Sequence, residues 1–203
     1  MTVNEIHEKL KAAFGEAVGA LAEPKVDPFT VVRGERLLEV ARFLKATPGL
    51  EFDHCNDLTG LDWPKRNLIE VVYHLFSYRH RHGLVLKVEL DRASPRLPSV
   101  TGIWKAANWL ERECYDMFGV VFEGHPDLRR ILLPDDWQGF PLRKDYAEAG
   151  GYHGISNERD NPLVELRRLD EKARAERPPP APAAAPPPAP APTAPAAPSP
   201  AKP

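Results

Sequence analysis

The first half of the chain alternates between helical and strand-like spacing of its apolar residues. Apolar side chains recur at three- and four-residue steps over residues 3–21, which predicts an amphipathic helix that Pro24 ends. Residues 30–32 predict a short strand, and a second helix is expected from Gly34 to the Thr-Pro-Gly at 47–49. The order that emerges is helix, strand, helix.

The middle of the chain predicts more sheet. Residues 50–58 are strand-like, and a turn is expected where Asp57, Thr59, Gly60 and Asp62 gather before Trp63-Pro64. The clearest hairpin joins residues 68–78 to the alternating run 84–90, across a polar break in which Gly83 is expected to supply a positive φ.

A third helix is predicted after this hairpin. Ser99 is the expected N-cap, and the helix should run to about Phe118 with Gly119 as its stop. Ile103, Ala107, Leu110, Cys114 and Met117 would share its apolar face, and on another face Arg112 and Asp116 could pair at i,i+4. The fold class is therefore α+β, a mostly antiparallel sheet with helices packed on one face.

The apolar period disappears after Gly119. Residues 111–146 mix Gly, Pro and Trp with paired charges, yet they hold too many large apolar side chains to be left in water. We predict an extended, irregular C-terminal arm laid along a surface, more readily a partner's than its own domain's. The expected division is an α+β domain over 1–118, a docking arm over 119–154, a short charged, helical segment over 155–177 and a disordered Pro/Ala tail over 178–203.

Composition narrows the classes of function. The net charge of −2 supplies no basic field for nucleic acid, and no window approaches the ~20 apolar residues of a membrane span. The N-terminus lacks the pattern of a secretory signal or transit peptide. Cys55 and Cys114 are too few to ligate an iron–sulfur cluster. The expectation is a soluble intracellular protein.

Each candidate for catalytic chemistry has a simpler structural interpretation. Asp135-Asp136, or Glu111 and Glu113 with Asp116, could act as acid and base, but neighbouring loop carboxylates seldom aim at one atom, so an ion network is favoured. The His80/His82 pair and the His54-Cys55 pair lack the spacing of a zinc site, and Cys114 lies on an apolar helix face. Arg129-Arg130 and Arg143-Lys144 could grip phosphate, but acidic residues are interleaved with them. A binding or scaffold protein is therefore preferred to an independent enzyme.

Longer motifs resemble a known family. These are ERECYDMFG at 111–119, FEGHPDLRRIL at 122–132, PDDW at 134–137, and Gly139 followed by PLRKDY at 141–146, with DLTGLDWP at 57–64 and VVYHL at 71–75 upstream. Together they are similar to the 30 kDa subunit family of respiratory complex I, which in bacteria provides the C subunit of NADH–quinone oxidoreductase. The resemblance covers roughly residues 25–146, and it departs from the family pattern at Phe140 and Ala147.

The resemblance implies a structural subunit of the peripheral arm of complex I. Such a subunit holds the quinone-reducing module together and has no catalytic residue, metal site or cofactor of its own. FMN, iron–sulfur clusters and quinone would lie in neighbouring subunits, and the whole complex would couple electron transfer from NADH to quinone with proton translocation. The implied partners are the large quinone-site subunit of the 49 kDa type and other peripheral-arm subunits, with peripheral, indirect attachment at the cytoplasmic face of the bacterial inner membrane.

The resemblance also implies an interface along the arm. Trp137, Tyr146 and the arginines are residue types common at interface hot spots. The expected interface residues are Glu111, Arg112, Glu113, Asp116, Gly119, His125, Pro126, Asp127, Arg129, Arg130, Pro134, Asp135, Asp136, Trp137, Gly139, Pro141, Arg143, Lys144, Asp145 and Tyr146. Two alternatives stay open: the equivalent subunit of a membrane-bound nickel–iron hydrogenase or formate hydrogenlyase, and a free-standing protein-binding module.

Overall fold

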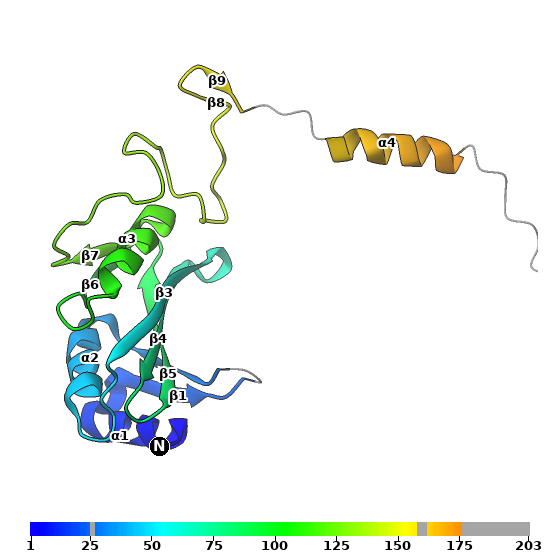
Figure 1. Ribbon diagram of the computed structural model, residues 1–203. Coiled ribbons are helices and arrows are strands. Elements are labelled where there is room, and N and C mark those ends of the chain that lie inside the picture. Colours follow the sequence, from blue (N-terminus) through cyan, green and yellow to red (C-terminus); the bar gives the residue numbers. More distant parts are fainter. Residues whose placement is uncertain (25–26, 158–161, 176–203) are drawn as a thin grey trace, which may run out of the picture. The chain divides into compact units, whose positions relative to one another are not determined.

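The computed structural model describes residues 1–24, 27–157 and 162–175 (Figure 1). The chain divides into two compact units, Met1–Ala149 and a second that begins at Gly150. The first unit contains α1 (Val3–Phe14), β1 (Val18–Ala22), β2 (Phe29–Val32), α2 (Leu37–Ala46), β3 (His54–Trp63), β4 (Leu68–Ser77), β5 (His82–Asp91), β6 (Arg96–Pro98), α3 (Ala107–Phe118) and β7 (Val121–Glu123).

The main sheet has five strands in the order β1-β2-β5-β4-β3, and β2–β5 is its one parallel pair among the described strands. The predicted hairpin is confirmed: β4 and β5 pair without a break from Leu68↔Asp91 to Ser77↔His82. The positive φ of its turn belongs to Arg81, at 53°, while Gly83 lies inside β5, so the role expected of Gly83 is wrong. Two more strands, β6 and β7, form a separate parallel pair.

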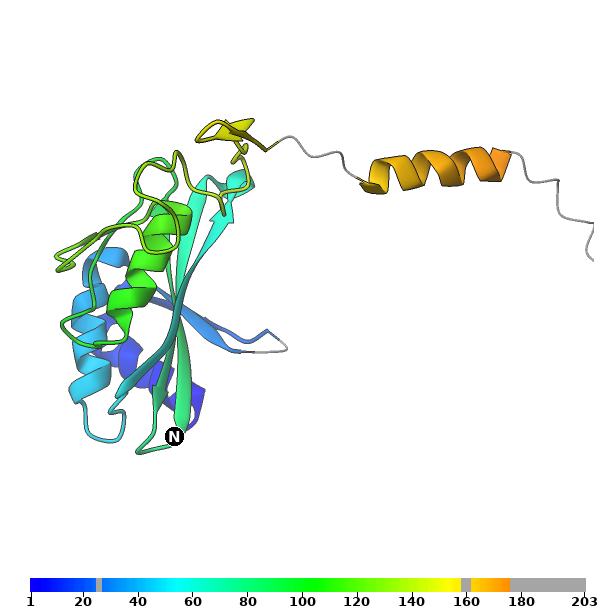
Figure 2. The same cartoon turned by 45° about the horizontal axis from the view of Figure 1, so that its top comes forward.

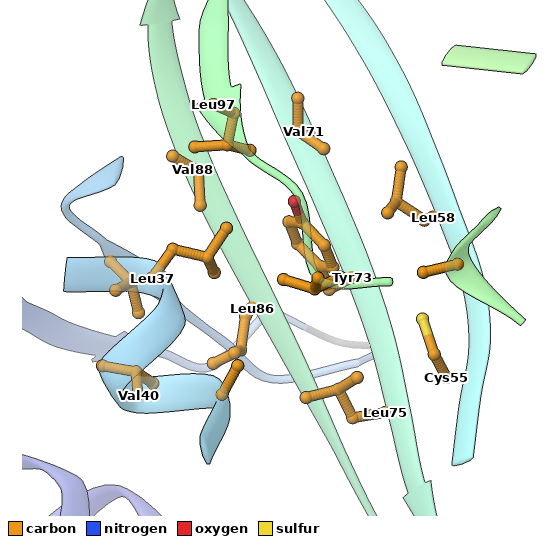
Figure 3. Close-up of a cluster of buried hydrophobic side chains, with 14 of the residues drawn as sticks. Leu37, Val40, Cys55, Leu58, Val71, Tyr73, Leu75, Leu86, Val88 and Leu97 are labelled. Carbon is orange, nitrogen blue, oxygen red and sulfur yellow. The ribbon is translucent and has the colours of Figure 1, made fainter. Parts of the chain in front are cut away.

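The helices α1, α2 and α3 all pack on one face of the main sheet (Figure 2). Alternate residues of the strands point into the core there, and Figure 3 shows side chains of α2 meeting those of the sheet around the fully buried Tyr73. The predicted α+β class, mostly antiparallel with helices on one face, is confirmed. The labelled core residues are Leu37, Val40, Cys55, Leu58, Val71, Tyr73, Leu75, Leu86, Val88 and Leu97.

The first predicted helix is too long at its C-terminal end. α1 ends at Phe14, because Gly15 adopts a φ of 56° and breaks the helical path. The residues from Val18 onward form β1 instead, with Val18 opposite Val32 and Leu21 opposite Thr30. Pairing with β2 outweighs an apolar spacing that suits a helix equally well.

The turn expected at residues 57–62 is also wrong. These residues lie inside β3, an edge strand on which polar side chains are tolerated, and the turn comes later, at Pro64–Arg66 with Asn67 at φ 52°. Gly60 is needed for packing: a Cβ there would lie 2.6 Å from the ring of Phe118. Gly60 therefore allows β3 and the end of α3 to approach each other closely.

The third helix begins later than expected. α3 starts at Ala107, and Ser99 does not cap it; the preceding residues form turns in which Ile103 and Trp104 both donate their N–H groups to the carbonyl of Val100. The predicted stop is confirmed, because Gly119 takes φ 76° and donates its N–H to the carbonyl of Tyr115.

The second unit contains a small hairpin, β8 (Gly151–Tyr152) with β9 (Ile155–Ser156), and the helix α4 (Pro162–Ala175). The helix expected within the charged segment is thus present, and Leu163, Leu166 and Leu169 on it are exposed. The Pro/Ala tail predicted over 178–203 lies outside the described residues. Among the described helices, none has the length and apolar character needed to cross a membrane.

Candidate functional site

The stretch from Gly119 to Tyr146, called the arm below, follows α3 and belongs to the same compact unit as the sheet. After β7 it contains no regular element, so its order depends on side chains that bind its backbone. Buried charged residues of α3 and of the β3 and β5 ends supply most of these bonds. Whether the arm docks on a partner, and the division at residue 118, stay predictions.

Asp116 is the main anchor of the arm. Its side chain is fully buried, and Oδ2 accepts hydrogen bonds from the backbone N–H groups of Ile131, Leu132 and Leu133 at 3.1, 2.8 and 2.9 Å. Its Oδ1 accepts a 2.7 Å bond from the guanidinium of Arg130. Burial alone would raise the pKa of Asp116, but these donors outweigh it and hold the pKa below its ordinary value.

Arg130 extends this anchor to the far part of the arm. Besides pairing with Asp116, its guanidinium donates to the carbonyl oxygens of Trp137 at 2.9 Å and Gly139 at 3.1 Å. Its charged plane also lies 5.6 Å from the ring centre of Phe140. One side chain therefore ties three points of the arm to the C-terminal turn of α3.

Two further residues hold the first part of the arm. Arg112 donates from Nε to the carbonyl of Arg129 at 3.2 Å and from Nη2 to that of Arg130 at 2.9 Å. The ring of His125 donates from Nε2 to the carbonyl of Asn108 at 3.0 Å, because its Nδ1 accepts from the N–H of Asp127. The expected Arg112–Asp116 pair is wrong, since each finds its partner in the arm instead.

The end of the arm is bound by a second buried carboxylate. Asp62 accepts from Nε of Arg92 at 2.6 Å and from the backbone N–H of Lys144 at 2.7 Å. The hydrogen bond from Arg92, with that from Lys144, lowers the pKa of Asp62. Arg92 also pairs with Asp145, and Arg143 donates to the carbonyl of Phe118 at 2.7 Å.

Glycines let aromatic rings close the arm onto α3. A Cβ on Gly119 would lie 2.5 Å from the ring of Phe140, and one on Gly139 would lie 3.0 Å from the ring of Tyr146. Both glycines have positive φ, at 76° and 81°. The guanidinium of Arg143 lies 5.0 Å from the centre of the Phe140 ring on which the arm closes.

Glu111 is fully buried but faces a different neighbour. Its carboxylate accepts from the hydroxyl of Ser99 and from the N–H of Val100, each at 2.7 Å, and no cation lies beside it among the described residues. Burial therefore raises the pKa of Glu111 to about 7. It fixes the loop before α3 rather than the arm.

The other expected interface residues divide by exposure. His125, Arg130, Trp137, Pro141, Arg143 and Tyr146 are half-buried, whereas the exposed ones are Glu113, Pro126, Asp127, Arg129, Pro134, Asp135, Asp136, Gly139, Lys144 and Asp145. The structure thus gathers the buried and half-buried members, Glu111 and His125 apart, around the C-terminal end of α3 and leaves the others on the surface. Their role in partner binding stays a prediction.

Sequence reasoning missed two of the residues that hold the arm. Asp62 was assigned to a turn and Arg92 to no role, although together they bind the end of the arm 53 or more positions along the chain, at Lys144 and Asp145. The signal available was the unusual polar Asp62 between apolar neighbours in a strand-like run. Nothing local in the sequence identifies its distant partners.

In the described part of the chain, no three His, Cys, Asp or Glu side chains lie close enough to one another to hold a metal ion. Cys55 and Cys114 are free and buried, and burial raises the pKa of Cys55 to about 12 and that of Cys114 further still. Both thiols therefore stay protonated at neutral pH, a state unsuited to nucleophilic attack or metal ligation.

Comparison with known proteins identifies the family. A family model described as respiratory-chain NADH dehydrogenase, 30 Kd subunit, matches residues 30–152. The C subunit of NADH-quinone oxidoreductase from Roseiflexus sp. (strain RS-1) is 49% identical over 139 residues, which cover 68% of this chain and 80% of the relative. Its counterpart of the same name from Chloroherpeton thalassium is 47% identical over 148 residues, 72% of this chain but 61% of that longer relative.

Two solved structures are similar as well. The trypsin-resistant fragment of Nqo5 superposes with a TM-score of 0.54 at 32% identity, over 63% of this chain and all of that one. A chain of the membrane-bound sulfane sulfur reductase, an archaeal respiratory membrane complex, superposes with a TM-score of 0.60 over 83% of this chain and 91% of that one; at 24% identity this likeness concerns the fold alone. Sequence and fold agree, and the chain belongs to the respiratory-chain NADH dehydrogenase 30 kDa subunit family.

Proposed function

We propose that this chain is a non-catalytic structural subunit of the peripheral arm of NADH–quinone oxidoreductase, where it holds the quinone-reducing module together. Electrons would pass from NADH through FMN and iron–sulfur clusters of neighbouring subunits to quinone, coupled to proton translocation. The family match over residues 30–152 supports the assembly. The anchored arm, which lies within that match, supports the structural role.

The observation that carries this proposal is the way the arm is ordered. Bonds from Asp116, Arg112, Arg130 and Asp62 already fix its path within the isolated chain. Its outer side nevertheless keeps Leu132 63% exposed and Leu142 49% exposed. An exposed apolar surface on a pre-ordered segment suits docking, because little further conformational entropy is lost when a partner binds.

The proposed partner is the large quinone-site subunit of the 49 kDa type, together with other peripheral-arm subunits. Large exposed leucines flanked by both signs of charge, as at Asp135 and Lys144, match the apolar centre and polar rim of a protein interface. Attachment to the cytoplasmic face of the bacterial inner membrane would then be indirect, through these subunits.

The buried state of the cysteines supports the absence of a cofactor on this chain. A cluster or metal needs thiolates or converging neutral and anionic ligands, whereas Cys55 and Cys114 are protonated within the core. The carboxylates buried in the described chain bind protein groups: Asp116 and Asp62 the arm, Glu111 the preceding loop, and Glu70 the side chains of Lys87 and Trp63. The proposed chain therefore positions other subunits and carries no electrons.

The first experiment is to tag the chain in its native cell, solubilise the membranes gently and identify what co-purifies. NADH:quinone activity in the recovered assembly, sensitive to a quinone-site inhibitor, is the expected result. A nickel-containing assembly that evolves hydrogen would replace the proposal with the hydrogenase-type alternative. A chain recovered alone would leave only the free-standing binding module.

A matched pair of variants tests the docking surface. Leu132→Glu places a charge on the arm's exposed apolar side and should lower the recovery of partner subunits, while Leu163→Glu, on the similarly exposed α4 outside the family match, should not. Circular dichroism of the purified chains checks that both fold. Equal recovery with both variants would contradict docking through the arm.

A further inference from the structure

A concave surface lies at the N-terminal end of α3, beside the bond between His125 and the carbonyl of Asn108. It is an open groove of about 770 Å³, called the Trp109 groove below. Four separate segments form it: the exposed side of α2, the loop before α3, the first turn of α3 and the start of the arm after β7. Its lining includes Leu38, Arg42, Thr101, Ile103, Lys105 and Trp109.

Trp109 is the unusual residue of this groove. Its side chain is 65% exposed, although Trp104, five residues earlier, is only 3% exposed and donates its indole N–H to the carbonyl of Phe52. Ile103, which is buried, and the half-buried Leu38 add apolar surface to the same groove. Tryptophan is among the residue types enriched at the hot spots of protein interfaces.

The groove has an excess of positive charge. Arg42 and Lys105 are both exposed, and neither lies within ion-pair distance of a carboxylate in the described part of the chain. The single acidic lining residue, Glu123, is 3.7 Å from Arg96 instead. The groove therefore presents two uncompensated cations.

The walls of the groove are already held in place. Ser99 donates its hydroxyl hydrogen to Glu111, so it accepts the 2.8 Å bond from the hydroxyl of Thr101. On the other side, His125 binds the carbonyl of Asn108 and pins the arm against α3. With these hydroxyl hydrogens turned inward, Thr101 offers lone pairs to the groove, which suits the N–H groups of an extended peptide.

We propose that the Trp109 groove receives an acidic segment of another subunit, with an apolar side chain against Trp109 and carboxylates beside Arg42 and Lys105. Charge complementarity selects this occupant, because a basic or neutral segment would leave both cations uncompensated as water is displaced. The inference rests on the proposed function only in requiring that the chain works inside an assembly. It adds a second contact, distinct from the outer side of the arm.

Site-specific photo-cross-linking in the native assembly identifies the occupant. Trp109→p-benzoylphenylalanine is introduced into the full chain, cells are irradiated, and the cross-linked peptide is sequenced by mass spectrometry after purification of the tagged assembly. We expect a peptide from another subunit that is rich in Asp and Glu at the cross-linked position. The matched control is Tyr78→p-benzoylphenylalanine, at a ring that is 64% exposed on the hairpin, which should not capture that peptide.

Charge reversal supplies the second readout. The double variant Arg42→Glu, Lys105→Glu, carrying the same photo-probe, should lower the yield of this cross-link about tenfold, and Arg42→Lys with Lys105→Arg should retain it. Three results in an intact assembly would overturn the groove proposal but not the proposed function. They are a cross-link to a basic or uncharged segment, a cross-link to a lipid, and no cross-link at all. A chain that never co-purifies with an assembly contradicts the proposed function and the groove together.

Discussion

The two ends of α3 hold their neighbours by opposite electrostatics. Near the C-terminal end, Asp116 is fully buried yet ionised, because Arg130 and three backbone N–H groups donate to it. Nearer the N-terminal end, Glu111 is equally buried but has only a hydroxyl and one N–H as donors. The pKa falls below its ordinary value in Asp116 and rises to about 7 in Glu111.

The difference shows that burial alone does not decide the charge of a carboxyl group. Desolvation raises the pKa of both side chains, and the number and charge of the donors determine whether it is overcome. The arm is thus bound by a charge that the fold stabilises. The loop before α3 is bound by a group whose ionised form burial disfavours.

The largest effect should follow from neutralising the first of these groups. Asp116→Asn removes the partner of a mostly buried guanidinium and leaves one amide oxygen for three N–H donors. We expect the free energy of unfolding to fall by about 3 kcal/mol, the lower end of the range for breaking a buried ion pair. Urea denaturation of the full chain at pH 7 measures it.

The control and a second readout keep this prediction specific to the anchor. Asp135→Asn, on the exposed surface of the arm, should leave the unfolding midpoint unchanged. Trypsin should cut after Arg129 and Arg130 faster in the Asp116 variant than in the parent chain, because the arm loses its tether to α3. Equal stability and equal cleavage rates would show that the arm is ordered by something other than this carboxylate.

The next largest effect concerns Glu111 and depends on pH. Its pKa is higher in the folded chain, about 7, than the ordinary 4.5, so the folded state binds more protons between these values. Stability from this group is therefore greatest at low pH and falls as pH rises through the window, by up to about 3 kcal/mol in all. Asp116, with a lowered pKa, has the opposite dependence: its contribution is lost as pH falls below about 4.

Glu111→Gln isolates this contribution, because the amide keeps a carbonyl for Val100 while Ser99 can turn its hydroxyl. Unfolding free energies are compared between pH 5 and pH 8. The gap between variant and parent should grow in favour of the variant as pH rises. The control is Glu113→Gln, two residues further on the exposed side of α3. Its unfolding free energy should change with pH in the same way as that of the parent chain. Parallel curves for both variants would contradict the raised pKa of Glu111.

The sequence predicts those parts of the fold that are stabilised by a local pattern, and it misses those that depend on distant contacts. The β4–β5 hairpin and α2 were predicted because their stability comes from apolar residues at regular spacing, which is a local pattern. β1 was mistaken for helix because Val18 and Leu21 fit both periods, and only pairing with β2 decides between them. Ser99 was mistaken for an N-cap because its hydroxyl is used by Glu111, twelve residues later.

The arm shows the limit more sharply. Its composition indicated a segment that must lie on a surface, and the family resemblance placed Arg112 and Asp116 among the expected interface residues. The actual partners, such as Asp62 with Lys144, are 82 residues apart and bind through a backbone N–H that every residue but proline carries. No pattern of side chains along the chain can specify such a bond.

The smallest effect is expected from an ion pair within the arm that is exposed and has a single donor, unlike the Asp116 anchor. Asp127 accepts a 2.9 Å bond from Arg129, and both side chains are more than half exposed. Asp127→Asn should leave the urea midpoint unchanged, because water and salt already screen this pair and replace it when it is lost. A loss as large as that from Asp116→Asn would mean that the arm responds to any missing Asp–Arg pair. Burial of the carboxylate would then not be what separates an anchor from a surface contact.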